Sequence, residues 1–167
     1  MSQPRYTVEL LNCESIDVAV MSHQGSPIQL PQTIQRFIEW RKLNRLPPSN
    51  NRTFNFVYSD PNTTPAEEYR FDLATDFPIQ QANKLDPSMQ DHGLHFESIP
   101  KGLYARVRHQ GPDSRLGDVI TYLLSDWIEQ QPYQLADFPI VFERINMYPE
   151  FTESEQVTDV LLALTTK

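Results

Sequence analysis

The tripeptide His-Gln-Gly occurs twice in this chain, at residues 23–25 and again at residues 109–111. An apolar, strand-like run precedes each copy, and a helix-like segment with two further strand-like segments follows it. Trp40 and Trp127 lie late in the two helix-like segments. A unit of about 80 residues that occurs twice predicts two pseudo-symmetric halves. We therefore expect a binding site where the halves meet, at positions that differ between them.

Each half is predicted to run strand, strand, helix, strand, strand, which makes the fold class α+β with antiparallel sheets and two main helices. The predicted strands cover residues 7–11, 17–21, 53–58, 69–74, 94–99, 103–108, 140–147 and 157–164. The first two strands are predicted to form a hairpin. The helix that opens at Pro31 has an apolar stripe formed by Ile34, Phe37, Ile38 and the stem of Arg41.

The domain organisation follows from a change in composition. Residues 78–93 are rich in Gln, Asn, Asp and Pro, which is typical of a linker between halves. We predict one domain over residues 1–167, with a first half at about 6–77 and a second half at about 94–165. No residues then remain for a DNA-binding domain.

Charge and cysteine content limit the function classes. The net charge of −8 and the pI near 4.9 argue against nucleic acid as a direct partner, because a phosphate backbone requires a positive surface. Arg106, Arg108 and Arg115 are predicted to lie on a solvated face. Cys13 is the single cysteine, so no internal disulfide can form. No signal peptide or membrane-spanning apolar run is found, and we expect a soluble, cytoplasmic protein without membrane contact.

The histidines are predicted to bind no metal. His23 and His109 each precede Gln-Gly at the end of a strand, where turn chemistry explains them. His92 and His95 are three residues apart, but no helix aligns them. Motifs for nucleotide cofactors and for nucleophilic hydrolases are missing from the sequence, so no cofactor is predicted.

Several short segments together resemble a known family. Tyr58–Pro61, Thr64–Glu67 and Arg70–Asp72 resemble the Y-x-D-P, T-P-x-E and R-x-D signature of the GyrI-like effector-binding domains. Residues 99–105, followed by His-Gln-Gly-Pro, resemble the second landmark of that family, and Phe142-Glu143 and Thr158-Asp159-Val160 match its two closing strands. The resemblance extends from about residue 6 to residue 164.

The resemblance implies both a fold and a function. The family includes gyrase-inhibitory proteins and the ligand-sensing halves of AraC-type and MerR-type multidrug regulators. Its fold consists of two SHS2-type modules related by a pseudo-two-fold axis, with a central cleft that binds hydrophobic, often cationic, small molecules. This chain is similar to the stand-alone members, and we expect a non-enzymatic domain that binds amphipathic cations. The alternatives are a hydrolase of strained electrophiles that uses Glu143, and an interaction protein whose partner is DNA gyrase or a regulator.

Glu143 is the main candidate for contact with a cation. It lies in an apolar, strand-like run, where an ionised carboxylate must be paired or face a cleft. The resemblance places the matching glutamate in the pocket. Counted from Pro61 and Pro149, the equivalent position in the first half is Asn55, so the two halves differ in charge there. The alternative is an edge-strand glutamate that lies in solvent or pairs with neighbours of Arg144.

The remaining candidates supply a second carboxylate and the walls of the cleft. Asp159 matches an acidic position of the family, and the alternative is that it ends a hairpin in solvent. The predicted wall residues are aromatic or apolar: Trp40, Phe56, Tyr104, Tyr122, Trp127, Ile145 and Leu161. Aromatic faces bind cations by stacking and cation–π contact, whereas core packing is the alternative for the helical ones. The family often has tyrosine where this chain has Ile145.

Overall fold

The computed structural model describes residues 6–60, 62–85, 93–146 and 152–167. It confirms the α+β class, with antiparallel strands and two main helices. The chain forms two compact units, which we name after their helices. The α1 unit is Ser15–Pro100, and the α2 unit combines the N-terminal segment up to Glu14 with Lys101–Lys167. Among the described residues, no helix has the length and apolarity that crossing a bilayer would require.

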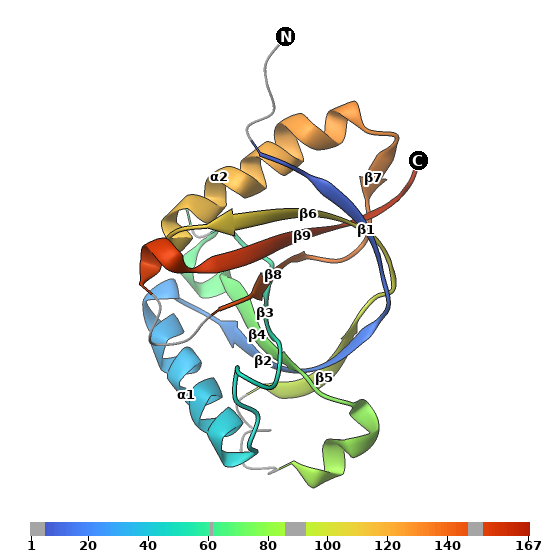
Figure 1. The fold of residues 1–167 in the computed structure, drawn as a ribbon. Helices are drawn as coiled ribbons and strands as arrows, with labels where there is room; N and C mark the ends of the chain where they lie inside the picture. Colours follow the sequence, from blue (N-terminus) through green and yellow to red (C-terminus); the bar gives the residue numbers. More distant parts are fainter. Residues whose placement is uncertain (1–5, 61, 86–92, 147–151) are drawn as a thin grey trace. The chain divides into compact units, whose positions relative to one another are not determined.

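The α1 unit is a four-stranded antiparallel sheet with one helix (Figure 1). The strands lie in the order β3-β4-β2-β5, and α1 packs beside β2. Their bounds are β2 Ile16–Gln24, α1 Leu30–Leu43, β3 Thr53–Val57, β4 Arg70–Asp76 and β5 Leu94–Ile99. Of the predicted linker, residues 79–84 form a 3-10 segment and residues 86–92 lie outside the described part.

The α2 unit has the strand order β1-β6-β9-β8, and the short β7 pairs with another stretch of β9. The strands are β1 Glu9–Cys13, β6 Gly102–Gln110, β7 Tyr133–Leu135, β8 Ile140–Arg144 and β9 Val157–Thr166. Helix α2, Leu116–Thr121, continues as a π-helical segment over Tyr122–Trp127 and a 3-10 turn over Ile128–Gln130.

The predicted hairpin between the first two strands is wrong. β1 pairs with β6, so that Leu10 lies opposite Ala105, and β2 pairs with β5 instead. Only Glu14 and Ser15 separate β1 from β2, and two-residue hairpins need residues with positive φ. Arg45 is the one non-glycine residue with positive φ in the described part of the chain, so this connection does not turn back. Each unit therefore takes an edge strand from the other half of the sequence.

The two His-Gln-Gly turns make matching backbone contacts. Gly25 has a φ of 120° and donates its N–H to the carbonyl of Tyr69 at 2.9 Å. Gly111 has a φ of 135° and donates to the carbonyl of Gln156 at 2.8 Å. Glycine adopts positive φ without steric cost, which explains why both copies of the tripeptide end in glycine. Each turn thereby binds the residue that precedes a strand, β4 in the α1 unit and β9 in the α2 unit.

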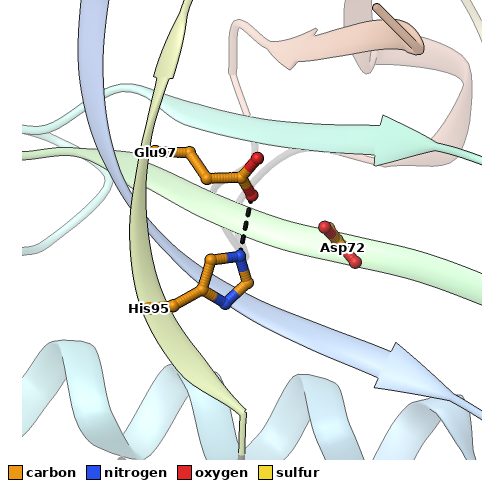
Figure 2. Close-up of side chains that lie close together, drawn as sticks. All are labelled: Asp72, His95 and Glu97. Atoms are coloured by element: carbon orange, nitrogen blue, oxygen red, sulfur yellow. Dashed lines mark hydrogen bonds and ion pairs between the residues drawn. The ribbon is translucent and has the colours of Figure 1, made fainter.

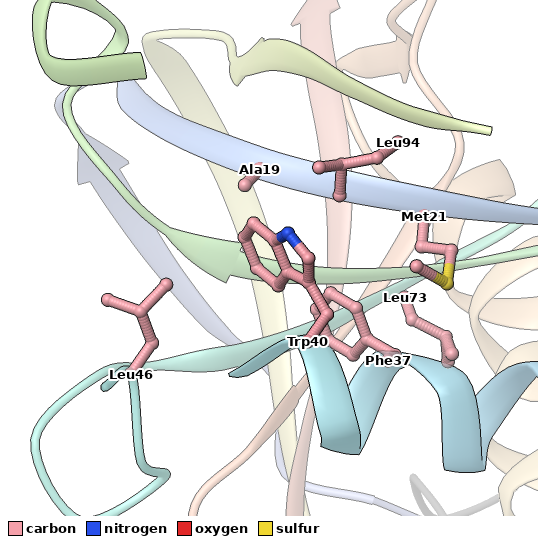
Figure 3. Close-up of a cluster of buried hydrophobic side chains, with 7 residues drawn as sticks. All are labelled: Ala19, Met21, Phe37, Trp40, Leu46, Leu73 and Leu94. Atoms are coloured by element: carbon pink, nitrogen blue, oxygen red, sulfur yellow. The ribbon is translucent and has the colours of Figure 1, made fainter. Parts of the chain in front are cut away.

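The core of the α1 unit lies between α1 and one face of the sheet (Figure 3). Trp40 has no exposed surface and stacks on Phe37 at a centroid distance of 5.8 Å. The buried stripe of the helix differs from the predicted one, because Ile38 is 39% exposed. Arg41 is buried whole, and its guanidinium donates to the carbonyls of Leu46 and Asn51 and to the hydroxyl of Thr53. Burial lowers the pKa of Arg41 to about 10, with nearby Asp76 opposing the shift.

Candidate ligand-binding site

A row of charged side chains crosses one face of the α2-unit sheet. Arg108 on β6 lies opposite Asp159 on β9, and Asp159 lies opposite Glu143 on β8. Residues directly opposite one another in an antiparallel pair point to the same face, with Cβ atoms about 4.5–5.5 Å apart. The two predicted carboxylates are therefore cross-strand neighbours.

Asp159 is held by Arg108 in a bidentate ion pair. Nε and Nη2 of Arg108 donate to the two carboxylate oxygens at 2.8 and 2.9 Å, and Arg106 Nη1 is 3.9 Å away. Asp159 is only 3% exposed, so the alternative that it ends a hairpin in solvent is wrong. The hydrogen bond to Asp159, together with its charge, raises the pKa of Arg108, and Glu143 contributes a smaller effect of the same sign.

Arg106 extends this row to the edge strand, where its Nη2 lies 3.0 Å from the carboxylate of Glu9. We call the five residues Glu9, Arg106, Arg108, Glu143 and Asp159 the charged face. It has three carboxylates and two guanidinium groups, which leaves one negative charge in excess. Arg108 is exposed, as predicted for the cluster of arginines, whereas Arg106 is half-buried, and both form ion pairs within the sheet.

Apolar side chains border the charged face. Ile145 lies two residues beyond Glu143 and is 39% exposed, and Leu161 lies two residues beyond Asp159 and is half-buried. Tyr104 belongs to the same face, opposite Ala163, and is 2% exposed. Burial, with a smaller effect of Cys13, raises the pKa of Tyr104 to about 12, so its hydroxyl stays protonated. The strand registers therefore place Glu143, Asp159, Leu161 and Tyr104 on one face, where Glu143 and Asp159 are direct neighbours and Tyr104 lies four residues before Arg108 on β6.

Tyr122 and Trp127 lie on the helical side of the same unit. The middle of the sheet face opposite the charged one is apolar and buried, formed by Ala105, Val107, Phe142, Val160 and Leu162. An amphipathic helix buries its apolar stripe on such a face, and we assign α2 to it (Figure 1). Tyr122 is buried against the ring of Tyr6 at 5.4 Å, and Trp127 is half-buried. The structure separates these two aromatic residues from Glu143.

The two candidates in the α1 unit lie on opposite faces of its sheet. Trp40 belongs to the core beneath α1, which assigns it to packing. Phe56 has no exposed surface and lies on β3 opposite Asp72 of β4.

The strand registers also correct the predicted correspondence between the halves. The glycine of each His-Gln-Gly turn donates to a backbone carbonyl, that of Tyr69 in the first half and that of Gln156 in the second. Three residues after each carbonyl comes an aspartate, Asp72 and Asp159 respectively. Asp72 is opposite Phe56, and Asp159 is opposite Glu143. Glu143 therefore corresponds to Phe56, and the predicted correspondence to Asn55 is wrong by one residue. The two prolines used for that count lie outside the described residues.

The family signature forms a polar cluster in the α1 unit. Arg70 holds the fully buried Asp72 through Nε at 3.1 Å and Nη2 at 3.0 Å, and its guanidinium lies 3.9 Å from the ring centroid of Tyr58. The hydrogen bond to Asp72 raises the pKa of Arg70, and burial followed by the charge of Asp72 raises that of Tyr58. These contacts give Arg70 and Asp72 of the R-x-D motif, and Tyr58 of the Y-x-D-P motif, a role in the structure of the α1 unit.

His95 and Glu97 on β5 complete this cluster; His95 was predicted to bind no metal, and Glu97 was not among the predicted site residues. One potential metal-ligating atom from each of Asp72, His95 and Glu97, a carboxylate oxygen or a ring nitrogen, lies within 4.8 Å of the other two (Figure 2). The available signal was the spacing of His95 and Glu97, because residues two apart on a strand share a face, whereas the prediction for His92 and His95 considered only helical alignment. His92 lies outside the described residues.

The sequence profile of the GyrI-like small molecule binding domain matches residues 6–165 of this chain. The chain belongs to the GyrI-like family. This GyrI-like domain is 29% identical over 159 residues to the probable transcriptional regulator YgiV of Escherichia coli, a match that covers 94% of the chain and 95% of the relative.

Two solved structures share the fold of this GyrI-like domain. The C-terminal domain of EcmrR has a TM-score of 0.72 at 15% identity, covering 98% of this chain and 99% of the other. SAV2435, solved bound to tetraphenylphosphonium, has a TM-score of 0.51 at 10% identity, covering 95% of this chain and 94% of the other.

Proposed function

We propose that this GyrI-like domain binds a hydrophobic, cationic small molecule at its charged face, with Glu143 next to the cationic group. The observation that carries the proposal is the register that places Glu143 directly opposite the buried Asp159. Like charges directly opposite one another destabilise a sheet unless a cation is close. Arg108 supplies one cation on the Asp159 side. A cationic ligand beside Glu143 would be attracted by both carboxylates.

The net charge of this face favours a cation over an anion. One negative charge is in excess, and both arginines already have carboxylate partners. Ile145 and Leu161 offer apolar surface on the same side of the sheet. Burying about 200 Å² of apolar ligand surface at ~25 cal/mol per Å² yields roughly 5 kcal/mol before the cost of association. Micromolar affinity is therefore the expected range.

Two relatives support this assignment. SAV2435 has the same fold and was solved with tetraphenylphosphonium, a hydrophobic cation. YgiV is a probable transcriptional regulator, which supports a role for this domain as an effector-binding module. We expect binding without turnover. Nothing among the described residues specifically favours the hydrolase or the gyrase-directed alternative, and both stay predictions.

Calorimetric titration with tetraphenylphosphonium and with neutral triphenylphosphine oxide tests the proposal. Calorimetry is preferable to tryptophan fluorescence because Trp40 is in the core and Trp127 lies on the helical side. Glu143→Gln should weaken binding of the cation at least about fivefold, since two unit charges 4 Å apart interact by ~1 kcal/mol even in bulk water. Binding of the neutral compound should not change.

Glu129→Gln is the matched control, because it removes the same charge from an exposed position after α2. It should leave the affinity for the cation unaltered. The proposal fails if tetraphenylphosphonium does not bind, or if Glu143→Gln and Glu129→Gln bind it equally well.

A further inference from the structure

Asp72, His95 and Glu97 converge above β2 in the α1 unit. His95 and Glu97 are two residues apart on β5 and share a face, and Asp72 reaches toward them from β4 (Figure 2). β2 lies between these strands, and the residues that face the cluster from it are small. Ser22 lies opposite Asp72, and Val20 lies opposite His95. These small side chains leave space above β2, in which the ligating atoms of Asp72, His95 and Glu97 lie within 4.8 Å of one another.

The hydrogen bonds of His95 leave one ring nitrogen facing a carboxylate. Nδ1 lies 2.9 Å from the carbonyl of Gly93, which can only accept, so Nδ1 carries a hydrogen. Nε2 lies 2.8 Å from Oε2 of Glu97. In a neutral imidazole Nε2 then presents a lone pair to another lone pair, and a positive species between them removes the conflict. Histidines that bind metals commonly donate their other N–H to a backbone carbonyl in this way.

The charges around this point suit a dication. Asp72 and Glu97 contribute two carboxylates, and Arg70 is the guanidinium that pairs with Asp72. Arg70 occupies one lone pair on each oxygen of Asp72, and an ionised carboxylate has about four such positions, so others remain. With a neutral His95 the cluster carries one negative charge in excess.

We propose that Asp72, His95 and Glu97 form a metal site for a divalent transition-metal ion, with Zn²⁺ as the best match. One imidazole nitrogen and two carboxylate oxygens are ligands that Zn²⁺ accepts, and three protein ligands leave a fourth position open. Tetrahedral ligands about 2.0–2.1 Å from the metal are about 3.3 Å apart. The His95–Glu97 distance of 2.8 Å and the overall limit of 4.8 Å lie on either side of that spacing, so modest side-chain movement completes the site.

Zn²⁺ titration of the purified, metal-free domain tests the site. Calorimetry should show one Zn²⁺ per chain, and Co²⁺ should give the visible absorption of a four-coordinate ion. His95→Gln and Glu97→Gln should each weaken Zn²⁺ binding by about 10–100-fold or more, since even the loss of a residue that only supports a ligand has that effect. The exposed Glu67→Gln removes the same charge as Glu97→Gln and should bind as the wild type does.

Two results would overturn the proposal. One is the lack of saturable, one-to-one Zn²⁺ binding by the wild-type domain. The other is equal Zn²⁺ affinity in His95→Gln, Glu97→Gln and Glu67→Gln, which would mean that the ion binds elsewhere. The Co²⁺ spectrum of the wild type answers the question independently if a variant fails to fold.

Discussion

Replacing Arg108 by methionine should make the domain less stable but a better binder of cations. The substitution removes both hydrogen bonds to Asp159, whose side chain is 4% exposed, and leaves the guanidinium of Arg106 at 3.9 Å from that carboxylate. Breaking a buried ion pair by removing one partner costs about 3–5 kcal/mol. Because the Arg108 side chain is 52% exposed and water can reach this side, we expect a smaller loss, at or below the lower limit of that range, about 2–3 kcal/mol.

The gain in affinity follows from the same geometry. Arg108 and Glu143 lie on the strands that flank β9, so about two strand spacings, or ~10 Å, separate them. Two unit charges at that distance interact by about 0.4 kcal/mol at the dielectric constant of water and about 1.7 kcal/mol at an effective value near 20. Loss of the repulsive guanidinium should therefore strengthen the binding of a cation at Glu143 by about 2- to 15-fold.

Urea unfolding and calorimetric titration with tetraphenylphosphonium measure the two effects separately. Added salt should reduce the gain in affinity, because screening acts over about 10 Å at 0.1 M ionic strength. Arg115→Met removes the same charge at an exposed position and should change neither quantity appreciably. A folded Arg108→Met variant whose affinity for the cation is unchanged or lower would refute the assignment of the ligand to the charged face.

Three further predictions concern stability. Arg41→Met leaves two buried carbonyls without their donor and should cost about 2–4 kcal/mol in urea unfolding; a cost below 1 kcal/mol would contradict the role of the guanidinium. Gly111→Ala should destabilise by about 1–3 kcal/mol because of its positive φ, whereas Gly117→Ala in α2, with open space around it, should stabilise by about 0.5–1 kcal/mol; equal effects would argue against backbone strain. The pKa of Tyr104 is raised from 10.0 to about 12, so the stability linked to its protonated hydroxyl is present below pH 10 and lost as pH rises toward 12. Tyr104→Phe should lose stability less steeply than the wild type in that window, by at most about 1.4 kcal/mol per pH unit, and parallel curves would show that Tyr104 does not contribute.

Local patterns in the sequence predicted the elements of this fold well. The period of apolar residues located both helices, and the repeated His-Gln-Gly located two turns whose glycines have positive φ. The family signature was sufficient to identify the GyrI-like family. These features depend on residues close together in the chain, which is why sequence spacing reveals them.

The strand registers could not be predicted, and they decide the site. A shift of one residue moves a side chain to the other face of a sheet, and this is the error that matched Glu143 with Asn55 instead of Phe56. The ion pair between Arg108 and Asp159 joins residues 51 positions apart, so it depends on the pairing of β6 with β9. The cluster of Asp72, His95 and Glu97 likewise requires β4, β2 and β5 to lie in that order.

The exchange of edge strands has a consequence for how the chain assembles during synthesis. The α1 unit is continuous in sequence and can close as soon as Pro100 has emerged, whereas the α2 unit cannot. β1 precedes its partner β6 by about 90 residues, because β6 begins only at Gly102. During synthesis β1 therefore has an unpaired edge until the α1 unit and β6 have both been made. Contacts between residues so distant in sequence raise the contact order and slow folding. We therefore expect the unit that carries Glu143 to form after the α1 unit, with β1 as the strand most exposed to mispairing until then.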